Sequence, residues 1–336
     1  MKTVLVLRFS AMGDVAITAS VMKEIAAQNP ETRFVFATRA FFAPFFKDIP
    51  NLEVFSVDVV KEVKEVKEVR EVKRVLDIYR ELNKNYKIDA VADLHDVLRT
   101  KILKFFFRFS FKRIKIASIN KGRKEKRKLC NVKTQKAQLK MMWQRYTEVF
   151  QKLKIKTEIK PTPIPFLQEK VKKIGVSPFA QHKGKVYPSE LMEKVLELLS
   201  AKSEIYLFGG GKTEKELCEK WQNQFNNVHS LVGKYSLTEE LEFISTLDVM
   251  LSMDSSGMHL ASLCGVPCVS IWGATHPYSG FVGFGQELNP QIQLDLSCRP
   301  CSVYGNKPCK YNDYRCLYGI APEAVVASIF EQVPFL

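Results

Sequence analysis

The sequence predicts an α/β protein in two halves, and three observations indicate this class. Buried apolar runs alternate with amphipathic helical segments from the start of the chain, as at 4–7 and 15–28. A proline-rich stretch at 160–166 interrupts the alternation, which starts afresh with an apolar run at 173–177. The segment 247–277 has the order strand, polar turn, helix, tight turn, strand, which is one βαβ unit of a parallel sheet. We therefore expect one parallel sheet in each half.

The proline-rich stretch is also the best candidate for a domain boundary, because it is unlikely to be helical. Successive βα units on both sides of it predict two Rossmann-like domains that face each other across a cleft. We place the first domain at 1–160 and the second at 161–320.

Each predicted element follows from its pattern of apolar residues. In the first half we expect strands at 4–7, 34–38, 52–57 and 90–95 and helices at 15–28, 41–47, 96–107 and 135–154. In the second half we expect strands at 173–177, 205–208, 249–253 and 268–272, helices ending near 199 and following 254, and a last helix at 322–332. Valines recur every third residue within 61–75, and this spacing drifts around a helix, so we interpret the repeat as a solvated helical surface with charge pairs.

Composition narrows the class of partner. The chain has 336 residues, 46% of them hydrophobic, and a net charge of +15, which favours nucleic acid, an anionic membrane face or a phosphorylated substrate. No apolar run approaches the length of a membrane helix, and the N-terminal run is too short for a signal peptide. We therefore expect a cytoplasmic protein.

Polar residues follow the predicted strands where ligands bind in parallel α/β sheets. Asp254, Ser255 and Ser256 start a helix whose free N–H groups and positive dipole end suit a diphosphate, although taken alone these residues are better explained by simple helix capping. Asp14 follows the first strand, and an N-cap aspartate is its alternative interpretation. The turn before it is not GxGxxG, and the glycine loop at 209–213 lacks the spacing of a P-loop, so neither supports a nucleotide motif.

The segment 101–140 is densely basic and aromatic, and three interpretations remain open. It is a solvated loop, a nucleic-acid surface with stacking aromatics, or a contact with anionic lipid. No recognised nucleic-acid motif accompanies the segment, which weakens the second interpretation.

Four cysteines near the C-terminal end have the spacing C-x₂-C-x₇-C-x₆-C. Such a group in a loop-rich segment is either a structural zinc site or a set of packed, reduced thiols. The residues concerned are Cys298, Cys301, Cys309 and Cys316.

Taken together, the motifs resemble glycosyltransferase family 9, the heptosyltransferases of lipopolysaccharide synthesis, over nearly the whole chain. The segment 8–14 matches the family's opening motif, 185–188 its K-x-(aromatic)-P segment, and 233–237 the segment near the nucleoside. The stretch 254–259 matches the D-[ST]-G-x-x-H signature with one departure, since Ser256 replaces the usual glycine. The resemblance implies the GT-B fold and a final helix within 321–336 that packs back on the first domain.

The resemblance also implies roles for individual residues. Asp14 is the proposed general base, and Lys185 meets the phosphates of the sugar nucleotide. The implied donor-binding residues are Gln181, Lys185, Tyr235, Asp254, Ser255, Ser256 and His259. The expected acceptor-binding residues are Ser10, Gly13, Arg123, Lys124, Lys126 and Arg127, with Lys128 adding to the basic run. A buried structural histidine is the alternative interpretation of His259.

The expected function is inverting transfer of heptose from ADP-heptose to a lipid-linked, anionic lipopolysaccharide inner core. No Asp-x-Asp occurs in the chain, so we expect no required metal or other cofactor beyond the ADP-sugar co-substrate. We expect peripheral contact with an anionic membrane at the inner face of the inner membrane, and no nucleic-acid partner. The alternatives are another sugar nucleotide or, in a different class, a nucleic-acid-binding protein that uses 101–140.

Overall fold

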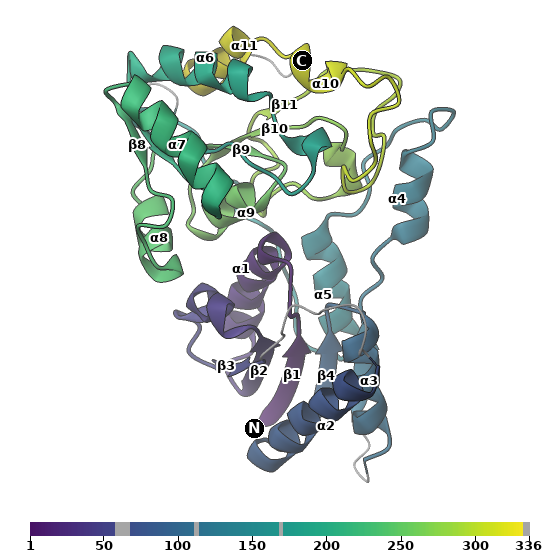
Figure 1. Cartoon of the computed structure of the whole chain (residues 1–336). Helices are drawn as coiled ribbons and strands as arrows, with labels where there is room; N and C mark the ends of the chain where they lie inside the picture. Colours follow the sequence, from purple (N-terminus) through teal and green to yellow (C-terminus); the bar gives the residue numbers. More distant parts are fainter. Residues whose placement is uncertain (58–67, 111–113, 168–170, 332–336) are drawn as a thin grey trace. The chain divides into compact units, whose positions relative to one another are not determined.

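The computed structural model describes residues 1–57, 68–110, 114–167 and 171–331, which form two compact units (Figure 1). The first unit comprises Met1–Lys121 and Met142–Lys160, and the second comprises Gly122–Met141 and Pro161–Leu336. Each unit has its own parallel sheet, so the predicted α/β class is confirmed. Within the described ranges no helix is both long and apolar enough to cross a membrane.

The first sheet has the strand order β3-β2-β1-β4-β5, and every neighbouring pair is parallel. Its strands are β1 (Lys2–Leu7), β2 (Thr32–Thr38), β3 (Leu52–Ser56), β4 (Ala90–Asp93) and β5 (Lys115–Ser118). The strand order reverses between β1 and β4, where Leu7 lies opposite Asp93. The carboxyl ends of these two strands therefore form the switch point at which such sheets bind ligands.

The helices of the first unit are α1 (Met12–Gln28), η1 (Ala40–Phe46), α2 (Glu68–Asn85), α3 (Leu98–Arg108) and α5 (Met142–Lys152). Buried residues from strands and helices, among them Leu7, Val91 and Phe107, form its core. Part of the valine repeat, 61–67, lies outside the described residues. The helix predicted at 135–154 begins only at Met142, because the residues before it belong to the other unit.

The second sheet has the order β11-β10-β9-β6-β7-β8, again with parallel neighbours. Its strands are β6 (Lys173–Ser177), β7 (Glu204–Leu207), β8 (Val228–Ser230), β9 (Val249–Met253), β10 (Cys268–Ile271) and β11 (Gln291–Ile292). Here the order reverses between β6 and β9, where Ser177 lies opposite Ser252.

The second unit also contains seven helices and two short 3₁₀ turns within the described residues. The helices are α4 (Arg123–Leu129), α6 (Ser189–Ser200), α7 (Lys212–Gln224), α8 (Leu237–Ile244), α9 (Ser256–Leu263), α10 (Arg315–Tyr318) and α11 (Pro322–Phe330), and the turns are η3 (Lys183–Lys185) and η4 (Pro277–Ser279). The last helix, α11, packs against α6 and buries Val325 and Ile329 in the second core. The structure assigns the described part of the segment 321–336 to the second unit, and its expected packing on the first domain stays a prediction. The described part joins the second unit because Val325 and Ile329 share one helix face, which the second core covers.

A boundary between the two units falls between Lys160 and Pro161, but the first unit is not a continuous range. The segment Gly122–Met141 leaves the first unit and returns to it at Met142. Backbone N–H of Leu139 donates to the carbonyl of Tyr278 at 2.9 Å, and Lys136 Nζ donates to the carbonyl of Leu296 at 3.1 Å. These bonds join the segment to loops more than a hundred residues away, which local patterns do not reveal.

Candidate functional site

The first candidate site surrounds Asp14, at the carboxyl end of β1. The N-cap residue of α1 is Ala11, and Asp14 lies in the first turn of the helix, so Asp14 is not the N-cap. Its carboxylate forms an ion pair with the guanidinium of Arg8, the residue that follows β1. Tyr146 of α5 donates its hydroxyl to Asp14 Oδ1 at 3.1 Å. The carboxylate is thus held by a cation and a hydroxyl from two other elements.

Both groups that hold Asp14 are buried. Burial raises the pKa of Tyr146 well above its usual range, so the hydroxyl stays protonated and acts as a donor. Burial opposes the charge on Arg8, but Asp14, Tyr146 and Asp93 together outweigh this effect, and the pKa of Arg8 is raised overall. Arg8 therefore carries a permanent positive charge, which stabilises the ionised form of Asp14.

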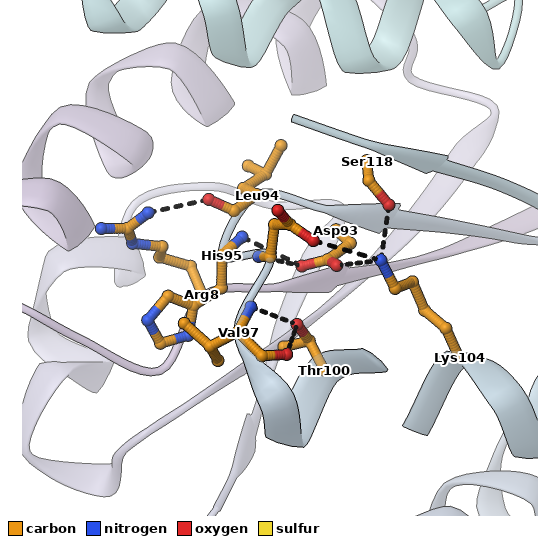
Figure 2. Close-up of polar contacts among 9 residues, drawn as sticks. Arg8, Asp93, Leu94, His95, Val97, Thr100, Lys104 and Ser118 are labelled. Carbon is orange, nitrogen blue, oxygen red and sulfur yellow. Dashed lines mark hydrogen bonds and ion pairs between the residues drawn. The ribbon is translucent and has the colours of Figure 1, made fainter. Parts of the chain in front are cut away.

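A histidine lies on the neighbouring strand end (Figure 2). Arg8 Nη1 donates to the carbonyl of Leu94 at 2.8 Å, and the N–H of Phe9 donates to Nδ1 of His95 at 3.4 Å. Burial lowers the pKa of His95 to about 3, and Arg8 and Lys121 add to this effect. His95 is therefore neutral at physiological pH, and because Nδ1 accepts, its proton resides on Nε2.

The turn that carries His95 is held by a buried ion pair. Asp93 accepts from the backbone N–H groups of His95 and Asp96 at 3.0 and 2.8 Å, and its other oxygen lies 2.6 Å from Lys104 Nζ (Figure 2). Lys104 also donates to the hydroxyl of Ser118 on β5 at 2.6 Å. This network ties β4, α3 and β5 together, so the backbone at His95 has little freedom to move.

The second candidate site lies at the carboxyl ends of strands in the second sheet. Lys185 Nζ lies 3.0 Å from Oδ2 of Asp254, which directly follows β9. Thr275, which follows β10, donates its hydroxyl to the same oxygen at 2.8 Å. The structure therefore brings together two residues, Lys185 and Asp254, that the sequence assigned to the donor from separate motifs.

Helix α9 starts beside this group. Ser255 occupies its N-cap position without a side-chain capping bond, so capping does not account for this serine. Ser256 is the first residue of the helix, and His259, one turn on, is buried. Gly257 packs so closely that a Cβ there would lie 2.5 Å from the side chain of Ser177. Gly257, which stands one position later than the glycine of the family signature, is thus required by the packing of α9 on β6.

The remaining predicted donor residues lie in loops. Gln181 is exposed in the loop between β6 and η3. Tyr235 follows β8, is partly exposed, and stacks on Phe243 with ring centroids 5.9 Å apart. Strand β8, which Tyr235 follows, is the outermost strand on its side of the sheet, and β7 and β6 lie between it and β9. Of the predicted acceptor residues, Ser10 precedes α1, and Gly13 lies within it, directly before Asp14 in the chain.

The basic run at 123–128 differs from our expectation in two ways. It forms α4, which belongs to the second unit and not to the predicted acceptor domain. Arg123, Lys124, Arg127 and Lys128 are exposed, as expected. Lys126, however, is only 2% exposed, and its Nζ lies 3.9 Å from the ring centroid of Phe281. We expected an exposed cation at this position, and the cation–π contact explains its burial.

The structure does not support the predicted zinc site. Cys298, Cys301, Cys309 and Cys316 all lie within the described residues, among which no group of three or more His, Cys, Asp or Glu is placed to hold a metal ion. Burial raises the pKa of Cys316 to about 11 and also raises that of Cys301. Cys301 and Cys316 are therefore protonated thiols at neutral pH.

Within the cysteine-rich segment, Arg299 links several loops of the second unit through hydrogen bonds. The buried guanidinium of Arg299 donates to the carbonyl oxygens of Trp272, Gly273, Thr275 and Leu294. The N–H of Cys301 donates to the carbonyl of Ala274 at 2.8 Å, and the N–H of Ala274 donates to that of Gly184 at 2.7 Å. This chain of bonds connects the segment to the turn that carries Lys185.

Sequence reasoning assigned no role to five residues of these sites: Arg8, His95, Tyr146, Thr275 and Arg299. For Arg8, His95 and Thr275 a signal existed, because each is a polar residue just after a predicted buried strand. Tyr146 and Arg299 gave none, since one lies within a helix and the other in a loop.

The two parallel sheets, with polar groups at their switch points, define a protein of two Rossmann-like units, a class in which ligands bind at the carboxyl ends of the strands. Residues 75–312, more than half of the chain, match the model of glycosyltransferase family 9 (heptosyltransferase). The chain therefore belongs to glycosyltransferase family 9, as its motifs predicted. The matched range begins after Arg8 and Asp14, so the interpretation of that site depends on its geometry.

Similar proteins agree with this assignment. The chain is 27% identical over 191 residues to lipooligosaccharide heptosyltransferase 2 of Campylobacter jejuni, a match over 53% of this chain and only 59% of that relative. Its fold is similar to that of E. coli heptosyltransferase WaaC with ADP, with a TM-score of 0.69, 17% identity, and coverage of 96% of this chain and 97% of that one. The E. coli ADP-heptose LPS heptosyltransferase II has a TM-score of 0.66 and 16% identity, with coverage of 98% and 97%. These similarities support the predicted GT-B fold.

Proposed function

We propose that the chain transfers heptose from ADP-heptose to the inner core of lipopolysaccharide, with inversion and without a required metal. The observation that carries the proposal is a pair of strand-end sites in a chain of this family. One site presents the carboxylate of Asp14, and the other the ammonium of Lys185. The names of the similar E. coli structures, which include ADP and ADP-heptose, support the choice of donor.

Asp14 is the proposed general base. An acceptor hydroxyl attacks the anomeric carbon of the donor and loses its proton to the Asp14 carboxylate as the new C–O bond forms. The bond between the anomeric carbon and the diphosphate oxygen breaks in the same displacement, which inverts the configuration. Arg8 and Tyr146 hold the carboxylate in one orientation, so little motion is needed when the acceptor binds.

Lys185 is the proposed partner of the leaving diphosphate. Its ammonium donates to phosphate oxygens and stabilises the charge that develops as ADP departs. Asp254 and Thr275 position the lysine, and the N-terminus of α9 at Ser255 and Ser256 adds backbone N–H donors. Gln181, Tyr235 and His259 remain proposed donor contacts. With these groups the protein itself supplies the positive charge that a metal would otherwise provide.

The acceptor is proposed to be a lipid-linked, anionic oligosaccharide at the inner face of the inner membrane, reached by a peripheral protein. Ser10 and Gly13, which lie at the start of α1 as Asp14 does, are the proposed contacts with the acceptor sugar. The exposed cations of α4 remain candidates for its anionic groups. Another sugar nucleotide is the second candidate donor, since the second unit would hold the diphosphate in the same way.

The test is to incubate the purified protein with a panel of sugar nucleotides and a lipopolysaccharide core acceptor, and to weigh the products by mass spectrometry. We expect a heptose adduct with ADP-heptose alone, and its yield should not change when EDTA is added. The Asp14→Asn variant is the matched control, because it keeps the shape of the side chain and removes its basicity. A product with another sugar nucleotide, or none with any, would overturn the choice of donor.

A further inference from the structure

Helix α3 exposes a stripe of large apolar side chains. Leu98 is 62% exposed, Phe105 58%, and Phe109, the residue that ends the helix, 71%. Their spacings of seven and four residues place them on one narrow face of the helix, because each residue advances about 100°. The rings of Phe105 and Phe109 lie against each other, with centroids 4.5 Å apart. Large apolar groups gathered on one exposed face usually mark an interaction site.

The opposite face of α3 is fixed in the core of the first unit. Thr100, Leu103 and Phe107 are buried there. Lys104 reaches the Asp93 carboxylate from the flank of the helix at 2.6 Å. Because this face is fixed in the core, the helix cannot rotate to bury the stripe, and the stripe faces solvent in the folded unit.

The charges beside the stripe select the kind of partner. Lys101 and Arg108, seven residues apart and both exposed, run along one flank of the stripe, and residues 97–110 include no Asp or Glu. Apolar aromatic groups flanked by cations, without acids, suit the interface of an anionic lipid bilayer. Helix α4 itself presents no such stripe, because its one large apolar residue, Leu129, is buried, and the exposed Val132 beyond its end is a single aliphatic side chain.

We propose that Leu98, Phe105, Phe109, Lys101 and Arg108, here called the α3 surface, dock the protein on an anionic bilayer. The phenyl rings would insert between the headgroups while the two cations meet lipid phosphates. The inference deepens the proposed function and rests on it in one respect, since docking would bring the first unit to a lipid-linked acceptor. It also divides the basic, aromatic segment 101–140, because the lipid contact falls on α3 and not on α4.

The experiment is pelleting of the full chain with vesicles of phosphatidylglycerol and phosphatidylcholine, and with vesicles of phosphatidylcholine alone, without donor or acceptor. We expect the wild type to bind the anionic vesicles and to bind the neutral ones far less. Phe105→Ser/Phe109→Ser should weaken anionic binding at least about tenfold, because it removes most of the apolar surface that enters the interface. Lys101→Gln/Arg108→Gln should weaken it by roughly thirtyfold at low salt, since each cation near the surface contributes about fivefold.

Two matched variants serve as controls. Lys124→Gln/Lys128→Gln removes the same charge from α4, and Leu167→Ser/Leu288→Ser removes exposed apolar side chains from the second unit. Both control variants should bind anionic vesicles with an affinity within about twofold of the wild type. This change is smaller than the roughly fivefold loss expected for each cation that contacts the bilayer. If the α4 variant loses binding and the α3 variants keep it, the proposal is overturned in favour of α4.

Self-association is the remaining alternative, and light scattering separates it from docking. If the wild type ignores vesicles but forms a dimer that Phe105→Ser/Phe109→Ser abolishes, the stripe is an interface between copies and the proposal fails. Transfer to a soluble, delipidated acceptor provides the link to function, and the α3 variants should retain it. Vesicle binding without any glycosyl transfer would contradict only the proposed function.

Discussion

The sites of the two units are built from the same parts in opposite roles. Each pairs an aspartate with a cation at the switch point of a parallel sheet. In the first unit the side chain of Arg8 is 5% exposed and that of Asp14 29%, so the carboxylate is the group offered to a ligand. In the second unit the side chain of Asp254 is 6% exposed and that of Lys185 18%, so the ammonium is offered. The more exposed partner determines the chemistry, and the buried partner orients it.

The largest expected effect comes from removing the exposed carboxylate. Asp14→Asn should lower kcat by about 10²–10⁴-fold, the usual contribution of a general base, while ADP affinity measured by calorimetry stays unchanged. Asp48→Asn, an exposed aspartate of the same unit, is the control and should behave as the wild type. A variant at position 14 that keeps more than about a tenth of kcat would exclude Asp14 as the base.

Removing the exposed cation of the second unit should give the next largest effect. Lys185→Ala should weaken ADP binding by roughly 10- to 150-fold, because a charge-assisted hydrogen bond contributes about 1.5–3 kcal/mol. Lys183→Ala is the matched control, since this lysine lies in the same short turn and its Nζ is directed at the ring of Tyr314. If calorimetry finds that both variants bind ADP as tightly as the wild type, Lys185 does not contact the phosphates.

Arg8 and Tyr146 are the two buried side chains that orient Asp14, and the contribution of such a group can be tested at Tyr146. Tyr146→Phe removes one hydroxyl that donates to Asp14 Oδ1 and keeps the ring. We expect kcat to fall by about 3- to 10-fold, since one hydrogen bond contributes about 0.5–1.5 kcal/mol, with KM for the donor unchanged. Tyr86→Phe, which also removes a hydroxyl bonded to a carboxylate, should leave kcat unchanged. Equal kcat for wild type and Tyr146→Phe would show that Asp14 needs no such support.

The last prediction concerns stability instead of catalysis, through the pH dependence of His95. The pKa of His95 is lowered from 6.5 to about 3 by burial, so the folded state favours the neutral ring. The stability gained from this preference is present above pH 6.5 and is lost as pH falls from 6.5 towards 3. At pH 5 the wild type should have lost roughly 2 kcal/mol of unfolding free energy relative to pH 8 through this group.

His95→Gln removes this titration and should flatten that part of the pH dependence. Denaturant unfolding at both pH values measures the difference between the wild type and the variant. His229→Gln is the control, because His229 is well exposed beside Glu204. Parallel pH profiles for the wild type and His95→Gln would mean that the imidazole is not held neutral.

Local sequence patterns were sufficient for the fold class and most strands. They also made Asp14 and Asp254 candidates, because each follows a buried strand that its own apolar run predicts. Lys185 became a candidate through the family resemblance, and the roles of all three residues stay predictions. In a parallel sheet, strand ends gather at one edge, so position along the chain already implies position at the site.

Only the tertiary structure decided which partners these residues have and which unit each segment joins. The tertiary structure buried Lys126 against Phe281 and placed α4 and α11 in the second unit. It also gave Arg299 a structural role beside the four cysteines, and no group of metal-ligating side chains placed to hold an ion occurs in the described part of the chain. Each of these outcomes depends on a contact between segments far apart in the chain, as between Asp14 and Tyr146. Hydrophobic periodicity reports the face of a single element, whereas the partner of that face is chosen by packing across the whole unit.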